Sequence, residues 1–230
     1  MVIQGLQKLT LLDYPDKVAC TVFTAGCNFR CPFCHNASLV VDTYKNKEIP
    51  EEDFFSYLNK RKGILDGVCV SGGEPLIQQG IETFLKKIKE MGYAVKLDTN
   101  GSSPDKLRKL VEEGLVDYVA MDIKNSPEKY GSTIGIEEYD ISHVCQSVTF
   151  LLKGNVPYEF RTTVVRRFHQ RADFHSIGRW IKGAEHYYLQ QFVDSGDLIK
   201  PGLRGYDKNV MQQALEVVKK YVETAQLRGL

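Results

Sequence analysis

The sequence predicts an α/β fold, an incomplete parallel (β/α)6 barrel with its helices on the outside. Three observations carry this prediction. Short apolar, β-branched runs alternate along the chain with segments whose apolar residues recur at helical spacing. Polar residues follow several of these runs directly, at the points where the strands would end. The chain has 230 residues, a length at which a single α/β barrel is common.

The elements are expected in the alternating order that this fold requires. Helix starts and stops are marked by Pro50 with an acidic first turn and by Gly92 and Gly114 after apolar helical stretches. In chain order we expect a short strand and turn at 10–17, strand 18–24, helix 50–63, strand 67–70, helix 81–91, strand 93–97, helix 104–113, strand 118–121, helix 141–152, strand 158–165, helix 172–183 with Trp180 in the core, strand 186–193 and a long closing helix 206–227.

The composition limits the kinds of partner and location. The 30 basic and 29 acidic residues leave a net charge of +1, which favours neither nucleic acid nor a membrane surface as the main partner. The N-terminus shows no long apolar segment with a cleavage site, and no stretch approaches the ~18 consecutive apolar residues of a membrane span. We therefore expect a cytoplasmic protein with a single domain over residues 1–230 and no nucleic-acid or membrane partner.

Three of the six cysteines fall within residues 27–34, CNFRCPFC, spaced by three residues and then by two. Gly26 ends the preceding strand, so these thiols lie on irregular backbone at a strand end. Clustered thiolates suit a soft metal, but zinc in a closed structural site takes four ligands. A four-iron cluster is also normally held by four cysteines, so three would leave one iron without a protein ligand. The alternatives to an iron–sulfur cluster at these three cysteines are a zinc knuckle and simply buried thiols.

The other cysteines and the histidines carry weaker signals. Cys20 and Cys69 lie in apolar strand-like runs and are expected to be ordinary buried thiols, and Cys145 is expected in the core on a helix. No histidine has metal-ligand spacing, and a surface or capping role is expected for His143, His169, His175 and His186.

Polar residues at the ends of the central strands form the second group of candidates. Ser71-Gly72-Gly73-Glu74-Pro75 follows strand 67–70, and adjacent glycines let the backbone approach a ligand closely. Asp98 and Asp122 end the next two strands, and an unpaired buried carboxylate is costly. Sites in barrels of this kind form at the carboxyl ends of the strands. We therefore expect these residues to face one pocket, with helix capping and turn formation as the alternative for the two aspartates.

The motif CxxxCxxC with Phe33 directly before its last cysteine resembles the signature of radical S-adenosylmethionine (SAM) enzymes, and residues 72–75 resemble their GGE(P) motif. This resemblance implies the radical SAM type of barrel and a [4Fe–4S] cluster held by Cys27, Cys31 and Cys34, with SAM on the open iron. Reductive cleavage of SAM would give methionine and a 5′-deoxyadenosyl radical, so no side chain is expected to be catalytic. The implied SAM-binding residues are Phe33, Ser71, Gly72, Gly73, Glu74, Asp122, Lys124 and Arg161.

The sequence leaves two possible partners for the Arg161 side chain. In strand 158–165 the alternation places Phe160, Thr162 and Val164 on one face, and Arg161 and Thr163 on the other, toward the barrel interior. A buried arginine needs an anionic partner, which is either the SAM carboxylate or a carboxylate within the barrel. His35 and Asn36 likewise are either polar loop residues or outer support of the cluster.

Two strand-end stretches, residues 98–101 (DTNG) and 121–124 (MDIK), narrow the resemblance to activases of glycyl radical enzymes, a group that includes the pyruvate formate-lyase activating enzyme. It implies a monovalent cation, Na⁺ or K⁺, held beside SAM by Asp98, Thr99 and Asp122. There is one departure, because Val193 stands where these activases carry a SAM-contacting histidine. Gln191 is the candidate that takes over part of that role.

Residues 5–15 (GLQKLTLLDYP) and 34–36 (CHN) resemble the activating proteins of anaerobic ribonucleoside-triphosphate reductases. The resemblance implies an oxidoreductase that removes a Cα hydrogen from a glycine of a partner glycyl radical enzyme, with flavodoxin or ferredoxin as electron donor. One alternative is a radical SAM enzyme acting on a small molecule or another peptide. The other is a non-enzymatic iron–sulfur or zinc protein, against which the three-cysteine loop and the GGE motif argue.

Overall fold

The computed structural model describes residues 1–229, and these form two compact units. The first unit consists of Met1–Asn28, Ser38–Thr99 and Asp105–Val119, and the second, as far as the structure describes it, of Phe29–Ala37, Asn100–Pro104 and residues 120–229. The expectation of a single domain over residues 1–230 stays a prediction.

The strands of the first unit run in chain order. Strand β1 (Ile3–Thr10) pairs antiparallel with β2 (Ala19–Thr24), whereas β2 pairs parallel with β3 (Gly67–Gly72) and β3 pairs parallel with β4 (Ala94–Thr99). Thr24 lies opposite Gly72, so the end of β2 that enters the cysteine loop lies beside the glycine end of β3. The core of β3 is fully buried, which explains its continuous apolar run, since both faces of a parallel strand are covered.

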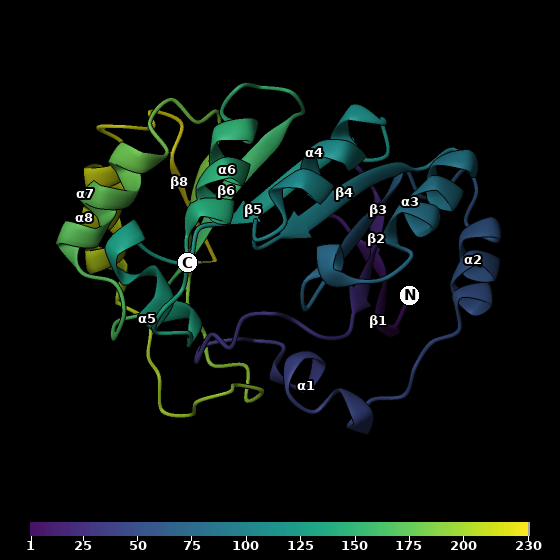
Figure 1. The fold of residues 1–230 in the computed structure, drawn as a ribbon, viewed down its shortest axis with the longest axis horizontal. Coiled ribbons are helices and arrows are strands. Elements are labelled where there is room, and N and C mark those ends of the chain that lie inside the picture. The colour runs from purple at the N-terminus through teal and green to yellow at the C-terminus, as the bar shows by residue number, and fades with distance from the viewer. Residues whose placement is uncertain (230) are drawn as a thin grey trace. The chain divides into compact units, whose positions relative to one another are not determined.

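The helices of the N-terminal half alternate with these strands (Figure 1). They are α1 (Ala37–Val40), α2 (Glu51–Asn59), α3 (Ile81–Glu90) and α4 (Pro104–Glu112), with short 3-10 helices η1 (Thr43–Lys45) and η2 (Pro75–Ile77). Helix α3 buries Ile81, Phe84, Leu85 and Ile88, the spacing predicted from the sequence. Strand β5 (Tyr118–Asp122) follows α4 and contains the boundary between the two units.

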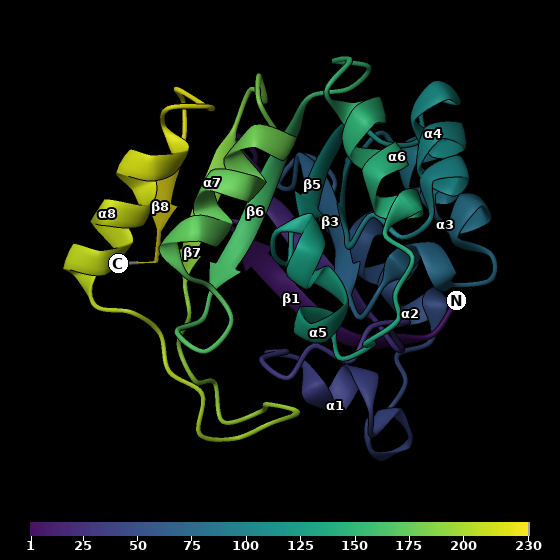
Figure 2. The same ribbon diagram turned by 60° about the vertical axis from the view of Figure 1, so that its left-hand side comes forward.

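The second unit repeats the pattern with β6 (Tyr158–Val164), β7 (Tyr187–Gln191) and β8 (Gln226–Arg228), which pair parallel in that order. Its helices are η3 (Pro127–Lys129), α5 (Tyr130–Ile134), α6 (Ser142–Leu151), α7 (Arg171–Trp180) and α8 (Lys208–Val218). Helix α7 begins with a capping box between Gln170 and Asp173 and packs against α8 (Figures 1 and 2). The predicted α/β class with mostly parallel strands is confirmed.

The first predicted strand is misplaced. Residues 10–17 were expected to begin with a short strand, but the strand is Ile3–Thr10, and residues 11–17 form bends and a turn. Its polar, exposed Gln7 and Lys8 break the apolar alternation from which a strand is recognised.

The prediction of a long closing helix over residues 206–227 is also wrong. Helix α8 ends at Val218, and the chain turns and adds β8 beside β7. Val222 and Ala225 are nearly fully buried, so the apolar pattern continues beyond the helix and imitates a longer one. Arg228 then binds both carboxylate oxygens of Glu159, at 2.9 and 3.2 Å, and lies 3.6 Å above the ring of Tyr188.

Core predictions for single residues have mixed outcomes. Cys20 and Cys69 are fully buried, as expected, and burial raises the pKa of the Cys20 thiol to about 12. Trp180 and Cys145 are only partly buried rather than core residues. His169 was expected at the surface or in a cap, but it is fully buried.

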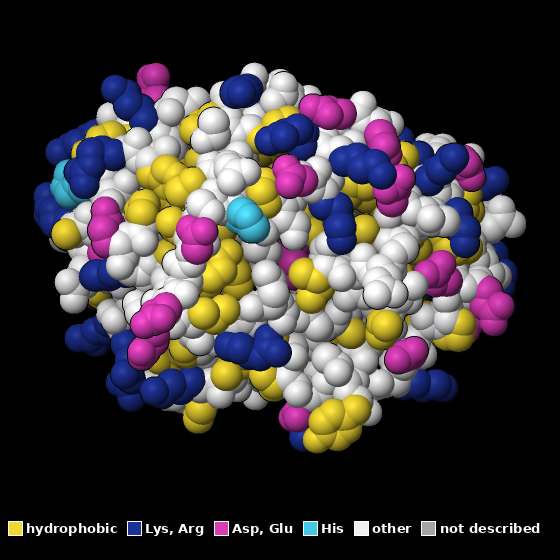
Figure 3. All heavy atoms as spheres, viewed as in Figure 1, with side chains coloured by type: hydrophobic (Ala, Val, Ile, Leu, Met, Phe, Trp, Pro, Cys, Tyr) yellow, Lys and Arg dark blue, Asp and Glu magenta, His cyan; other side chains and the backbone are white. Residues whose placement is uncertain are grey.

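The surface carries both signs of charge. On the face drawn in Figure 3, Lys and Arg side chains are intermixed with Asp and Glu side chains, in keeping with the near-equal totals of 30 and 29. Among residues 1–229, no helix combines the length and the apolar character that crossing a membrane requires.

Candidate active site

The first cysteine and the glycine-rich stretch are held together by backbone contacts in the first unit. Gly26, which precedes Cys27, accepts a hydrogen bond at 2.8 Å from the backbone N–H of Glu74, and Gly73 donates at 2.9 Å to the carbonyl of Thr24. A Cβ on Gly73 would lie 1.8 Å from the oxygen of Gly26, and Gly72 has φ +117°. Only glycine fits both positions, so the two glycines serve a close backbone approach.

The second and third cysteines lie in the second unit on a separately anchored turn. The backbone N–H of Cys34 donates to the carbonyl of Cys31 at 3.0 Å, and Lys200 donates to the carbonyl of Pro32 at 2.9 Å. Phe33 is buried, with its ring 5.5 Å from that of Phe168. Burial raises the pKa of the Cys34 thiol, while the Asn36 N–H and the Lys124 charge act in the opposite direction.

The donor set fits an iron–sulfur cluster. Cys27, Cys31 and Cys34 form no disulfide, and three thiols on one loop are the ligand type that such clusters use. No three His, Cys, Asp or Glu side chains among residues 1–229 are grouped so as to hold a single metal ion. That finding concerns one ion, whereas a four-iron cluster is a larger group.

At the end of β4, the predicted cation ligands contact other protein groups. Asp98 forms an ion pair with Lys96, and its Oδ2 accepts a hydrogen bond from Ser71 at 3.1 Å. Thr99 donates at 2.8 Å to the fully buried carboxylate of Glu74, which also accepts from the Leu76 N–H. The sequence analysis did not single out Lys96. The spacing Lys-x-Asp could have predicted its pairing with Asp98, because side chains two residues apart in a strand point to the same face.

At the end of β5, three predicted SAM-binding residues lie together. Asp122 Oδ2 is 2.8 Å from Lys124 Nζ, and its Oδ1 is 3.0 Å from Arg161 Nε. Burial alone would raise the pKa of Asp122, but these two cations hold it well below its usual range. Burial alone would lower the pKa of Lys124, and the neighbouring carboxylate instead raises it. Arg161 thus has the internal salt bridge that was one of its two interpretations.

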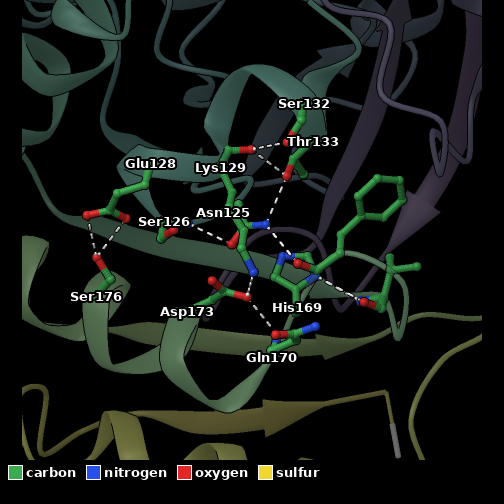
Figure 4. A network of polar contacts seen from close by, with 12 residues as sticks. Asn125, Ser126, Glu128, Lys129, Ser132, Thr133, His169, Gln170, Asp173 and Ser176 are labelled. Carbon is green, nitrogen blue, oxygen red and sulfur yellow. Dashed lines mark hydrogen bonds and ion pairs between the residues drawn. The ribbon is translucent and has the colours of Figure 1, made fainter. Parts of the chain in front are cut away.

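Asn125 and His169 belong to a network of polar contacts (Figure 4), and His169 also contacts the backbone of Lys124. The ring Nδ1 of His169 lies 3.1 Å from the Val165 N–H, which makes it the acceptor and leaves Nε2–H to donate to the carbonyl of Lys124 at 2.9 Å. Asn125 donates to Thr133 and to the carbonyl of Phe168, at 2.9 and 3.1 Å. Sequence reasoning missed this positioning role of His169, because a lone histidine in a loop carries no spacing signal.

The end of β7 offers an acceptor for a ligand. Val193, which replaces the expected histidine, is 63% exposed. Gln191 donates through Nε2 to the carbonyl of Tyr206 at 2.6 Å, and its Oε1 is buried without a hydrogen-bond partner among the described residues. A buried polar atom of this kind is costly unless a partner satisfies it, so it fits a ligand that carries an amine or hydroxyl, as SAM does. His35 lies nearby in this unit, its ring 5.2 Å from that of Phe192.

Comparison with known proteins identifies the class. The family model of the Radical SAM superfamily matches residues 21–180, and the chain belongs to this superfamily. It is 30% identical over 234 residues to a protein of Methanocaldococcus jannaschii that is provisionally named a glycyl-radical enzyme activating enzyme, a match covering 99% of this chain and 96% of that one. It is also 32% identical to the pyruvate formate-lyase-activating enzyme of Clostridium pasteurianum, over 54% of this chain and 52% of the relative.

A solved structure supports the fold. Streptococcus suis SuiB bound to S-adenosylmethionine matches with a TM-score of 0.70 at 13% identity, over 90% of this chain and 49% of that one. The predicted radical SAM type of incomplete α/β barrel is therefore confirmed as the fold class. The protein is an enzyme of the radical SAM type, and its cofactors are those of the family, a [4Fe–4S] cluster and SAM.

The contact between Gly73 and Gly26 leads to a stability prediction. Gly73→Ala lowers the free energy of unfolding by roughly 3 kcal/mol, because the added methyl overlaps a backbone oxygen that cannot move freely. The control is Gly63→Ala, which has φ +77° but open space around the added carbon and costs about 1 kcal/mol. Urea titration measures both. Equal losses in the two variants would contradict the steric argument.

His169 gives a pH prediction. Burial lowers its pKa below the ordinary value of 6.5, so the unfolded chain takes up a proton that the folded chain does not. The free energy of unfolding therefore falls as pH drops below 6.5, by up to about 1.4 kcal/mol per pH unit for this proton. His35, whose pKa burial also lowers, adds to the slope. In denaturant titrations from pH 7.5 to 5, His169→Gln reduces the slope and the exposed control His143→Gln does not. An unchanged slope in His169→Gln would refute this.

Proposed function

We propose that this protein is an activase that introduces a glycyl radical into a partner enzyme, such as an anaerobic ribonucleotide reductase. The observation that carries the proposal is the match to the Methanocaldococcus jannaschii protein, because it extends over 99% of this chain and 96% of that relative. The partial match to a pyruvate formate-lyase-activating enzyme supports the same class of reaction. A cytoplasmic location, without a nucleic-acid or membrane partner, belongs to the proposal.

The proposed roles of the residues follow their positions. Cys27, Cys31 and Cys34 hold the cluster, and the backbone of residues 71–74 binds the amino group of SAM. Lys124 and Arg161 carry positive charge suited to the SAM carboxylate, and Asp122 holds both in place at 2.8 and 3.0 Å. When bound and reduced by one electron from the donor, the cluster and SAM would supply methionine and a 5′-deoxyadenosyl radical; that radical would take a hydrogen atom from a glycine Cα of the partner, giving 5′-deoxyadenosine and a glycyl radical. The buried Phe33 keeps the cysteine turn in contact with its apolar surroundings.

The electron donor is proposed to bind at a basic hollow in the second unit. This hollow, about 390 Å³ in volume, is lined by Arg166, Arg167, Lys200, Pro201, Gly202, Leu203 and Arg204. All four of its basic residues are exposed, and its lining contains no acidic side chain. The backbone N–H of Lys200 bonds to Pro32, inside the cysteine loop. An acidic electron-transfer protein such as a flavodoxin or ferredoxin would be steered toward the loop by this charge.

Charge reversal tests the basic hollow. Arg166→Glu/Arg167→Glu lowers the rate of cluster reduction by reduced flavodoxin about tenfold or more at low salt, because steering is lost, and leaves reduction by dithionite unchanged. The control is Lys182→Glu, exposed before β7 and thus toward the opposite end of that strand. Stopped-flow absorbance of the cluster measures the rates. Equal rates in both variants would remove the hollow as the donor site.

The proposed function is tested by anaerobic reconstitution with iron and sulfide, followed by reduction in the presence of SAM and a candidate glycyl radical enzyme. We expect 5′-deoxyadenosine together with an EPR signal of a glycyl radical on the partner. Both are lost, by at least about a hundredfold, in Cys27→Ala, because the cluster loses a ligand. Cys145→Ala, a partly buried cysteine outside the loop, retains both.

Two results would distinguish the radical SAM chemistry from the proposed activation of a glycyl radical enzyme. Formation of 5′-deoxyadenosine without a glycyl radical on any partner would leave the radical SAM chemistry and point to a small molecule or another peptide as the substrate. Full activity in Cys27→Ala would overturn the cluster assignment itself.

A further inference from the structure

A buried lysine lies beside one of the residues expected to hold a monovalent cation. Lys96 is in the middle of β4, where it faces Cys69 of β3 in the sheet register, and only 1% of its side chain is exposed. A buried ammonium group is costly unless a carboxylate pairs with it. Lys96 meets this requirement through Asp98, two residues further along the same strand.

Both oxygens of the Asp98 carboxylate have donors from the protein. Oδ1 pairs with the Lys96 ammonium, and Oδ2 accepts the hydrogen bond from Ser71 at 3.1 Å. Asp98 is itself largely buried, with 15% of its side chain exposed. A metal cation bound to this carboxylate would have to stand next to an ammonium group of the same charge, and little solvent is present to screen their repulsion.

The other carboxylate expected at the cation site is also neutralised. Asp122 faces Lys124 Nζ at 2.8 Å and Arg161 Nε at 3.0 Å, so two positive groups surround one negative group. In each unit, the carboxylate expected to bind the cation thus already forms an ion pair with a positively charged side chain of the protein. The residues do not fit the Na⁺ or K⁺ that the resemblance implies.

We propose that the ammonium group of Lys96 is a built-in replacement for the monovalent cation, so that this enzyme binds and cleaves SAM without Na⁺ or K⁺. Lys96 acts as a positioning residue: it holds the carboxylate of Asp98 and keeps the local charge balanced. The inference rests on the proposed activase class, whose resemblance implies the cation, and on the β4 geometry; it does not depend on the identity of the partner enzyme.

The test compares the cation response of the wild type and of Lys96→Met. Melting temperatures are measured in choline chloride, NaCl and KCl at equal ionic strength, on the protein as purified, and SAM cleavage is measured on the reconstituted enzyme. For the wild type we expect the same melting temperature in all three salts, and 5′-deoxyadenosine rates within about twofold. Lys96→Met should melt several degrees lower in choline and regain stability saturably with Na⁺ or K⁺, because Asp98 then lacks its cation.

Two control variants make the result specific. Lys109→Met removes an exposed lysine that pairs with Glu82 on the surface, and it should show no selective response to Na⁺ or K⁺. Lys96→Met/Asp98→Asn removes both charges of the buried pair, so it should fold without responding to either cation.

The outcomes decide the proposal. A saturable gain in wild-type melting temperature or SAM cleavage with Na⁺ or K⁺ over choline overturns it. A folded Lys96→Met that gains no cation response also overturns it. If Lys96→Met does not fold in any salt, the wild-type comparison alone decides, because cation independence is the central claim. Failure to find a glycyl radical partner leaves these melting measurements unaffected.

Discussion

A charge that leaves water must be paired, and this constraint organises both groups of strand-end residues. In the first unit Lys96 is buried against Asp98, and in the second Asp122 is held by Lys124 and Arg161. The cost of leaving one member alone fixes the side-chain geometry without any bound ligand. Within each unit the charged side chains are therefore already held in place by protein partners, as expected of preorganised groups.

The parts of the site that could be predicted from sequence are those whose chemistry is local. Cys27, Cys31 and Cys34 are recognised by spacing alone. The adjacent Gly72 and Gly73 predict a close approach to the backbone, and the structure explains it, because neither position has space for a Cβ. The alternation of strands and helices followed from periodicity, because buried parallel strands and amphipathic helices have different periods. The predicted cluster and SAM contacts remain assignments from motif and resemblance.

The parts that could not be predicted depend on contacts distant in sequence. His169 can be fully buried because its two ring nitrogens form hydrogen bonds with the backbone of Val165 and Lys124. No spacing pattern in the sequence predicts these contacts. Strand β8 pairs with β7, and its Arg228 contacts Glu159, 69 positions earlier in the chain, whereas the apolar residues before β8 favoured a longer helix. Lys96 was recognisable in principle, since Lys-x-Asp on a strand places both charges on one side, but a charged residue within an apolar run is ordinarily assigned to the surface.

The backbone contact between Gly26 and the stretch Gly73–Glu74 has a consequence for how this architecture can diversify. The segment that carries the first cysteine and the segment expected to bind the SAM amino group are joined by main-chain atoms, through the 2.8 Å bond from Glu74 to Gly26. Side-chain substitutions elsewhere therefore leave the spacing of these two segments unchanged. Loops that contact the substrate can therefore differ in sequence without loosening this connection, because no side chain takes part in it.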